Sequence, residues 1–386
     1  MGNLPNNLFK RYLQLKESYY EISISAQKLF GGTKVENLDA CREFICEHLT
    51  RGHKSEVMNI PWIENFNHSH KHVHVVTLYL LGLIFQNCVS EHIRRDLRQF
   101  IADLDWYDYR YSWFLTCLYH DIASNIELAT IPPNPSEQQK QLLYYLGDND
   151  INYTIFNYKR FQHAYTARFS ESLVQNYFYY RSSCGECDHG ILGGYFLFDR
   201  LYKNFQNNTM DGRSTDVLYR VSSHLDHFAY ICDSIICHNI WTIQTFDVLE
   251  NETAQNAKEV EKYKRFGLSP LILKNRGERL RFTEHPLQFI LCLADTIEPI
   301  KRFTEDDGRI IPGEREVLSA IDISLAANNS CLNDTCLKIT WEDTVNGWCG
   351  FDKWTENIIK AKNWLAVSVE EKRSNNEISI SFDKEE

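Results

Sequence analysis

The chain has 386 residues, of which 43% are hydrophobic and 24% charged, and its formal net charge is −11. This composition excludes an extensively disordered chain, because enough apolar side chains are present to form a core. The acidic balance argues against duplex nucleic acid as a partner, since its phosphates are bound by basic surfaces. No stretch approaches the roughly 20 apolar residues that cross a bilayer, and residues 1–14 lack a signal-peptide core. We therefore expect a cytoplasmic protein without a membrane partner.

Apolar segments with helical spacing recur along the first three quarters of the chain. Packing helices are expected within residues 8–50, and longer runs that are apolar on nearly every side follow at 73–85, 113–122, 191–201, 228–241 and 287–300. Runs of this kind are typical of buried helices. We predict a mainly α protein in which buried helices form a bundle, connected by polar segments of variable length.

The pattern changes after about residue 310, where the apolar residues begin to alternate as they do in strands. Alternation occurs at 320–325, 337–341 and 377–382, and residues 351–367 have helical spacing. We predict a small C-terminal α+β appendage and three regions: N-terminal packing helices over 1–58, a helical core over 59–308 and the appendage over 309–386. The strands at 320–325 and 377–382 are expected to offer sheet edges with which a second copy could pair as a homodimer.

The buried helices share one feature, which is a His or an Asp in apolar surroundings. An imidazole or carboxylate buried without a partner costs on the order of a few kcal/mol, so convergence on a shared metal would satisfy several of them together. Nitrogen and oxygen ligands without thiolates suit one or two divalent ions such as Mn, Mg, Fe, Co or Ni. The candidate ligands are His74, His120, Asp121, His189, His238 and Asp295.

These residues stand in an order that resembles the signature of the HD-domain superfamily of metal-dependent phosphohydrolases. The family pattern is a His, a His-Asp doublet and a later Asp, which His74, His120-Asp121 and Asp295 match. The segment Leu293–Thr296 is similar to the family's closing Leu-Ala-Asp. The resemblance implies an HD-domain helical bundle that hydrolyses a phosphoester with a hydroxide activated by the metal. His120 and Asp121 would then be the catalytic pair, and a small phosphorylated molecule such as a nucleotide would be the substrate.

The first ligand of the family pattern has two candidates in this chain. The family places an aliphatic residue four positions after this His and a small residue eight positions after it. His74 has Leu78 and Gly82 at these positions, whereas His72 has Leu80 at the second of them. The resemblance therefore favours His74.

The ligand of the third helix also has two candidates. His189 is followed by Gly193 and Gly194, where the family has a small residue, and His163 is followed by Ala167. We favour His189 and expect the glycine pair to lie against a neighbouring ligand helix. In the two-ion arrangement, His189 and His238 would hold a second ion that the carboxylate of Asp121 bridges to the first.

Residues that could bind the substrate phosphate are less constrained by the sequence. We expect this role for Lys159, Arg160, His72 and His163. The densest basic segment, residues 262–281, has two interpretations, as a phosphate-binding segment or as an exposed face that balances acidic side chains.

Two other functions are compatible with the same residues. The chain lacks the Gly-Tyr-Pro triplet of the HD-GYP subfamily, and no Arg-rich doublet immediately precedes His120, as one does in deoxynucleotide triphosphohydrolases.

The ligand set also resembles the HD-fold proteins that oxygenate small molecules at a di-iron centre. A third interpretation is an HD module without catalytic activity that senses a ligand.

Overall fold

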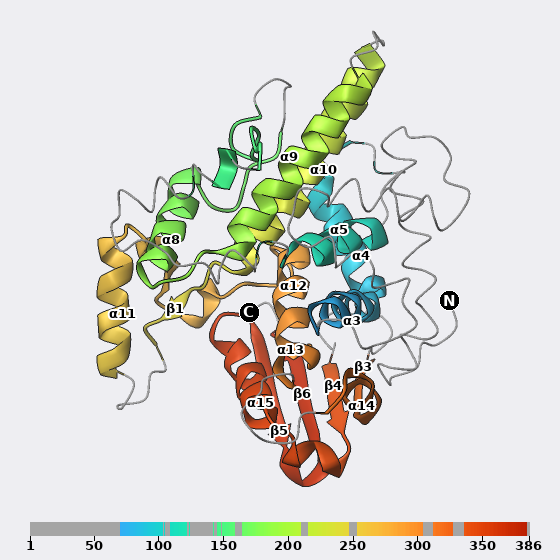
Figure 1. The fold of residues 1–386 in the computed structure, drawn as a ribbon, viewed down its shortest axis with the longest axis vertical. Helices are drawn as coiled ribbons and strands as arrows, with labels where there is room; N and C mark the ends of the chain where they lie inside the picture. Colours follow the sequence, from blue (N-terminus) through green and yellow to red (C-terminus); the bar gives the residue numbers. More distant parts are fainter. Residues whose placement is uncertain are drawn as a thin grey trace, which may run out of the picture. The chain divides into compact units, whose positions relative to one another are not determined.

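A computed structural model describes residues 70–102, 104, 109–121, 123, 142, 145–147, 149–158, 164–209, 215–246, 253–303, 312–326 and 336–383. These residues are mostly helical, with a small antiparallel sheet near the C-terminus (Figure 1). The prediction of a mainly α chain is confirmed at this level. Within the described ranges, no helix is both long enough and apolar enough to cross a membrane. The helices predicted within residues 8–50 lie outside the described residues.

The described chain forms two compact units, each assembled from segments that are distant in sequence. The first unit contains residues 70–92 and 279–383, and the second contains residues 93–278. Helix α4 (Gln86–Leu97) runs from one unit into the other. In this division the C-terminal sheet, which lies in the predicted region 309–386, shares a unit with helices of the predicted region 59–308. The predicted N-terminal region, residues 1–58, lies outside the described residues.

In the first unit, helix α3 (His70–Ile84) packs against α12 (Pro286–Ile297) and α13 (Ile300–Phe303). Helix α12 is buried along almost its whole length, as its apolar run predicts. It ends because Glu298 precedes Pro299, and a residue before proline is disfavoured in the helical conformation. Glu298 is accordingly extended, with φ −63° and ψ 119°. The break places two short helical turns, the end of α12 and the start of α13, beside α3.

The sheet of the first unit is antiparallel, with the strand order β3-β4-β6-β5. Its strands and the two helices of the same segment are β3 (Ile321–Ala326), β4 (Cys336–Trp341), β5 (Val367–Lys372), β6 (Glu377–Phe382), α14 (Glu314–Ala320) and α15 (Phe351–Lys360). The strand predicted at 377–382 matches β6, but β6 lies inside the sheet, so the expectation that it offers a free edge is wrong. The helix predicted over 351–367 ends at Lys360, and a strand follows it.

Helix α15 joins this sheet to the helices of the first unit. The indole of Trp354 is fully buried, and its Nε1 donates to the backbone oxygen of Ile297 at 3.1 Å. Gly350, with φ +81°, lies so close to the backbone oxygen of Arg302 that a side chain there would collide with it. The C-terminal segment therefore packs against α12 and α13 within the first unit.

The second unit contains α5 (Tyr109–Tyr119), α8 (Glu171–Ser183), α9 (His189–Thr209), α10 (Thr215–His238), α11 (Thr253–Arg265) and a two-stranded parallel sheet of β1 (Ile243–Gln244) and β2 (Ile272–Leu273). Helices α9 and α10 lie side by side and both contact α5 (Figure 1). A Cβ atom on Gly194 would lie 2.5 Å from Cγ1 of Ile236 and 2.9 Å from the backbone oxygen of Cys232. Gly194 thus lies against α10, the helix that carries the candidate ligand His238, and the role of that helix in binding a metal stays a prediction.

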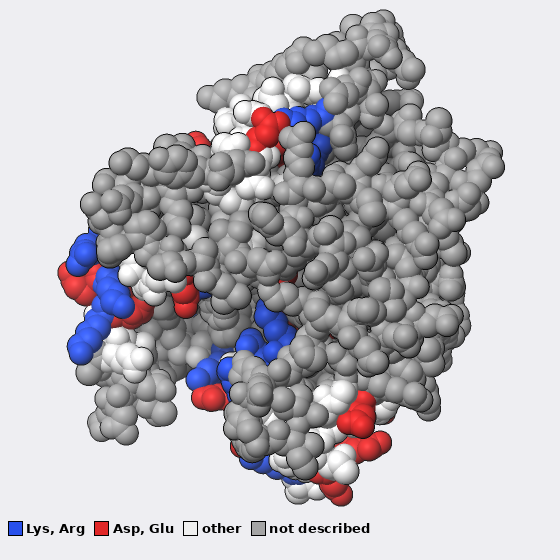
Figure 2. Space-filling view, viewed as in Figure 1, with Lys and Arg blue, Asp and Glu red and all other residues white. Residues whose placement is uncertain are grey.

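Helix α11 carries much of the basic segment that the sequence singled out. Lys262, Lys264 and Arg265 are exposed on it, and Lys262 pairs with Glu259 at 3.4 Å. Figure 2 shows Lys and Arg side chains mixed with acidic ones over this helix. Such a mixture fits an exposed face with balanced charge better than a phosphate-binding surface.

Candidate metal centre

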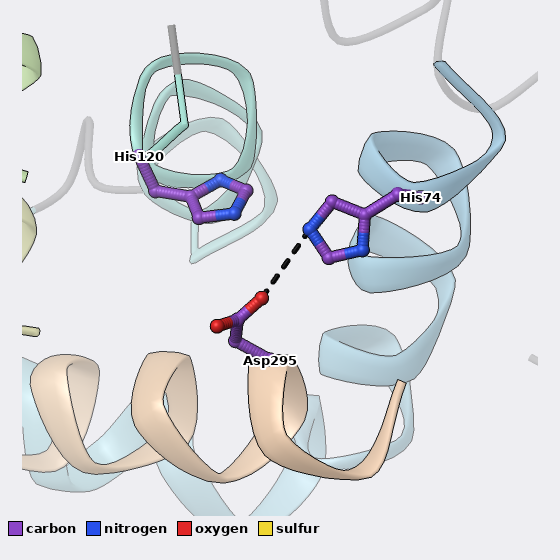
Figure 3. A group of neighbouring side chains, drawn as sticks. All are labelled: His74, His120 and Asp295. Atoms are coloured by element: carbon purple, nitrogen blue, oxygen red, sulfur yellow. Dashed lines mark ion pairs between the residues drawn. The ribbon is translucent and has the colours of Figure 1, made fainter. Parts of the chain in front are cut away.

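The first unit brings together two of the predicted ligands, one from α3 and one from α12. Nε2 of His74 lies 3.3 Å from Oδ1 of Asp295 (Figure 3). The His74 side chain is buried, and that of Asp295 is 22% exposed. An imidazole nitrogen and a carboxylate oxygen thus face one another, and this oxygen is buried although the Asp295 side chain is partly exposed. His120, also drawn in Figure 3, belongs to the second unit.

A third residue, Glu298, fixes the orientation of the His74 ring. Nδ1 of His74 donates to Oε2 of Glu298 at 2.7 Å, and the glutamate is completely buried. The Glu298 carboxylate also accepts the backbone N–H groups of Ile300 and Lys301 at 3.0 and 3.1 Å. A carboxylate on one ring nitrogen directs the other nitrogen toward a metal. Sequence reasoning missed Glu298, although it follows Asp295 by three residues at the end of the same helix.

The two carboxylates control the charge of His74. Burial by itself lowers the pKa of this imidazole, but Glu298 and Asp295 together outweigh it and raise the pKa to about 9, with Lys301 opposing them. Without a bound metal the ring is therefore protonated at neutral pH and neutralises the neighbouring carboxylates. To ligate a metal through Nε2, it must release that proton.

The second unit carries the His-Asp doublet at the end of α5. The sequence pattern predicts a helix through residue 122, but α5 ends at Tyr119, and the doublet occupies the turn that follows. The backbone nitrogen of His120 still donates to the oxygen of Thr116 at 3.0 Å, so the helical hydrogen bonding reaches His120. Both His120 and Asp121 are buried.

Helices α9 and α10 place two further predicted ligands beside this doublet. His189 is the first residue of α9 and His238 is the last residue of α10. Nε2 of His189 lies 3.5 Å from Oδ1 of Asp121. The ring of His238 has its centroid 5.5 Å from that of His189 and 5.6 Å from that of His120. Four of the six predicted ligands thus form one continuous group in the second unit.

Backbone groups hold two of these imidazoles in place. Nδ1 of His120 donates to the backbone oxygen of Cys117 at 2.8 Å, and Nδ1 of His238 donates to that of Ile235. In a metal complex, the other ring nitrogen, Nε2, would be the ligand atom of each imidazole. A Cβ atom on Gly190 would lie 2.8 Å from Cε1 of His238, so this glycine allows the ring to rest on α9. The sequence argument used Gly193 and Gly194 and missed Gly190, which directly follows His189.

The predicted substrate-binding residues are not placed by the structure. Lys159, Arg160 and His163 lie outside the described residues, and His72 lies on α3 with its side chain outside them. The choice between His163 and His189 therefore stays a prediction, although His189 does lie among the other candidate ligands.

The two groups of side chains fit a divalent metal by the chemistry of their donor atoms. They offer imidazole nitrogens and carboxylate oxygens. Sets of these ligand atoms bind hard and borderline divalent ions, from Mg²⁺ to Zn²⁺. Comparisons with protein-family models, with curated proteins and with solved structures found no match. Any function assigned to the chain therefore has to be argued from these side chains themselves.

Proposed function

We propose that this protein is a metal-dependent phosphohydrolase that hydrolyses a phosphoester, with a nucleotide as the expected substrate. The observation that carries the proposal is the grouping of the candidate ligands on buried helices. His74 and Asp295 face one another in the first unit, and His120, Asp121, His189 and His238 are grouped in the second. Buried groups of this kind are typical of functional sites rather than of packing alone.

The proposed ligand set uses all six residues. In the arrangement that the resemblance to the HD-domain pattern implies, His74, His120, Asp121 and Asp295 would hold one ion, and His189, His238 and Asp121 would hold a second. The support is chemical, because a divalent ion takes about four to six ligands and His74 with Asp295 supplies only two. The resemblance to the HD-domain pattern combines the same residues.

When bound, divalent ions supply Lewis acidity that makes water nucleophilic near neutral pH and neutralises charge on a phosphoryl group. The chain's own residues prepare the site. Glu298 holds the His74 ring, and the carbonyl groups of Cys117 and Ile235 hold those of His120 and His238. In the net reaction water adds its oxygen to phosphorus, the bond to the alcohol oxygen breaks, and the alcohol leaves with a proton.

The test is a phosphate-release screen of the full chain with Mn, Mg, Co, Ni or Fe supplied. The substrates are nucleoside mono- and triphosphates, cyclic mono- and dinucleotides and simple phosphomonoesters. We expect release from at least one class, and loss of it in Asp121→Asn and Asp295→Asn but not in His92→Ala. His92 is the matched control, since it is a helical histidine outside both groups. A metal-loaded protein that releases phosphate from no class would overturn the proposal.

A further inference from the structure

A lysine lies at the same carboxylate oxygen that faces His74. Nζ of Lys301 is 3.6 Å from Oδ1 of Asp295, and Nε2 of His74 is 3.3 Å from that oxygen. The Lys301 side chain is 33% exposed, whereas His74 is buried. The candidate metal ligand Asp295 thus lies between the buried imidazole of His74 and the partly exposed side chain of Lys301.

The position of Lys301 is fixed by the break between α12 and α13. Its backbone nitrogen donates to Oε2 of Glu298 at 3.1 Å, and the same oxygen accepts from Nδ1 of His74 at 2.7 Å. One buried carboxylate therefore holds both the imidazole and the backbone from which the lysine side chain extends. The backbone of Lys301 is therefore held in place, and its ammonium group lies within ion-pair distance of Asp295.

Stability alone gives a weak reason for this ion pair. Partly exposed ion pairs contribute little to folding, because solvent screens the attraction and ordering of the long side chain opposes it. A metal ion bound to Asp295 would neutralise the negative charge of the carboxylate and repel the ammonium group of Lys301. The ammonium group near the ion would then attract an anion that is bound to the same ion.

We propose that Lys301 binds the phosphoryl group of the substrate when a metal ion occupies Asp295, and pairs with Asp295 when no ion is bound. This inference rests on the proposed phosphohydrolase function. A compact ammonium acts as a point charge, and its attraction is stronger for a doubly charged phosphoryl group than for a singly charged diester. The substrate class is thus a phosphomonoester or a terminal phosphate of a nucleotide, rather than a cyclic nucleotide.

The test compares Lys301→Met with Lys301→Arg and with the control Lys360→Met. Lys360 is an exposed lysine of the same unit that pairs with Glu356. Calorimetry with Mn²⁺ alone should show equal or tighter binding to Lys301→Met, by up to about fivefold, because a competing cation has been removed. Inorganic phosphate should bind to the Mn-loaded variant at least about tenfold more weakly than to wild type, and Lys301→Arg should restore most of that binding.

The opposite signs of the two effects separate a phosphate-binding role from a structural one. Weaker binding of both Mn²⁺ and phosphate in Lys301→Met would overturn the inference, and so would unchanged phosphate binding. If wild type binds Mn²⁺ and releases phosphate from esters while Lys301→Met behaves like Lys360→Met, only the role of Lys301 fails. If wild type binds no Mn²⁺ or other divalent ion, the proposed function fails and the inference fails with it.

Discussion

His74 and Glu298 are joined by a 2.7 Å hydrogen bond between two buried side chains that lie 224 positions apart in the sequence. Because this bond sets which nitrogen of His74 faces Asp295, we expect Glu298→Ala to weaken Mn²⁺ binding by about 10- to 100-fold. Glu298→Gln should weaken it less, since the amide oxygen can still accept from Nδ1. Calorimetry measures the effect, with Glu356→Gln as an exposed control. A folded Glu298→Ala protein with wild-type affinity would show that the glutamate has no positioning role.

Metal affinity should depend on pH through His74. Its pKa of about 9 in the metal-free protein means that the ring carries a proton through the neutral range, and only the neutral form can ligate. The apparent affinity should therefore rise about tenfold for each pH unit from about pH 6.5 to about pH 8.5. Titration in buffers of different ionisation enthalpy should also detect close to one proton released at neutral pH. Affinity that stays constant over this range would contradict the prediction.

The stability of the second unit should depend on pH through Asp96. Burial raises the pKa of this carboxyl to about 7, while Arg95 and the hydroxyl of Tyr230 act in the opposite direction. The unfolded chain loses this proton near 3.8 and the folded chain near 7, so the folded state becomes less stable as pH rises between these values. Asp96→Asn should then raise the free energy of unfolding at about pH 8, by on the order of a few kcal/mol, and change it little below about pH 4.

Urea unfolding of wild type and Asp96→Asn across this pH range is the measurement. The two curves of stability against pH should converge in acid and separate in base. Parallel curves would mean that Asp96 ionises in the folded state as it does in the unfolded chain.

Gly190 offers a way to move one ligand without removing it. A methyl group at this position would lie 2.8 Å from Cε1 of His238, so Gly190→Ala should displace the ring and lower the metal content by the ion that His238 holds. Gly147→Ala is the matched control, because no atom lies within 4 Å of its added methyl group. Metal analysis together with circular dichroism distinguishes a displaced ligand from an unfolded protein. Full metal content in a folded Gly190→Ala protein would exclude His238 as a ligand.

Much of the fold follows from the sequence where one local pattern decides the structure. The apolar run that begins at Leu287 forms a helix buried on nearly every side, and the alternation over Glu377–Phe382 forms a strand with those same bounds. Strand β5 is not predictable in this way. Its segment, Val367–Lys372, comes after helix α15 and is rich in glutamate and lysine. Such residues are unfavourable in strands in general but are common on an exposed edge, which β5 forms.

The candidate site is predictable as a set of residue types but not as a geometry. The sequence singles out His189 and His238 because a polar ring in an apolar helix needs a partner. It does not single out Glu298 and Lys301, because their role depends on a break before Pro299 and on contacts with α3, which is far away in the sequence. The grouping of the C-terminal sheet with α12 escapes prediction for the same reason, since contacts such as Trp354 with Ile297 leave no local pattern.

We propose that the candidate ligand side chains bind divalent metal, and the metal content per chain is the measurement that decides it. Wild-type protein loaded with Mn²⁺ should hold about two ions. His74→Ala and Asp121→Asn should each lose the first ion or both ions, and His189→Ala should retain about one ion. His163→Ala and His92→Ala should hold as much metal as wild type. Metal content equal to wild type in His74→Ala, Asp121→Asn and His189→Ala alike would show that these residues do not bind the metal.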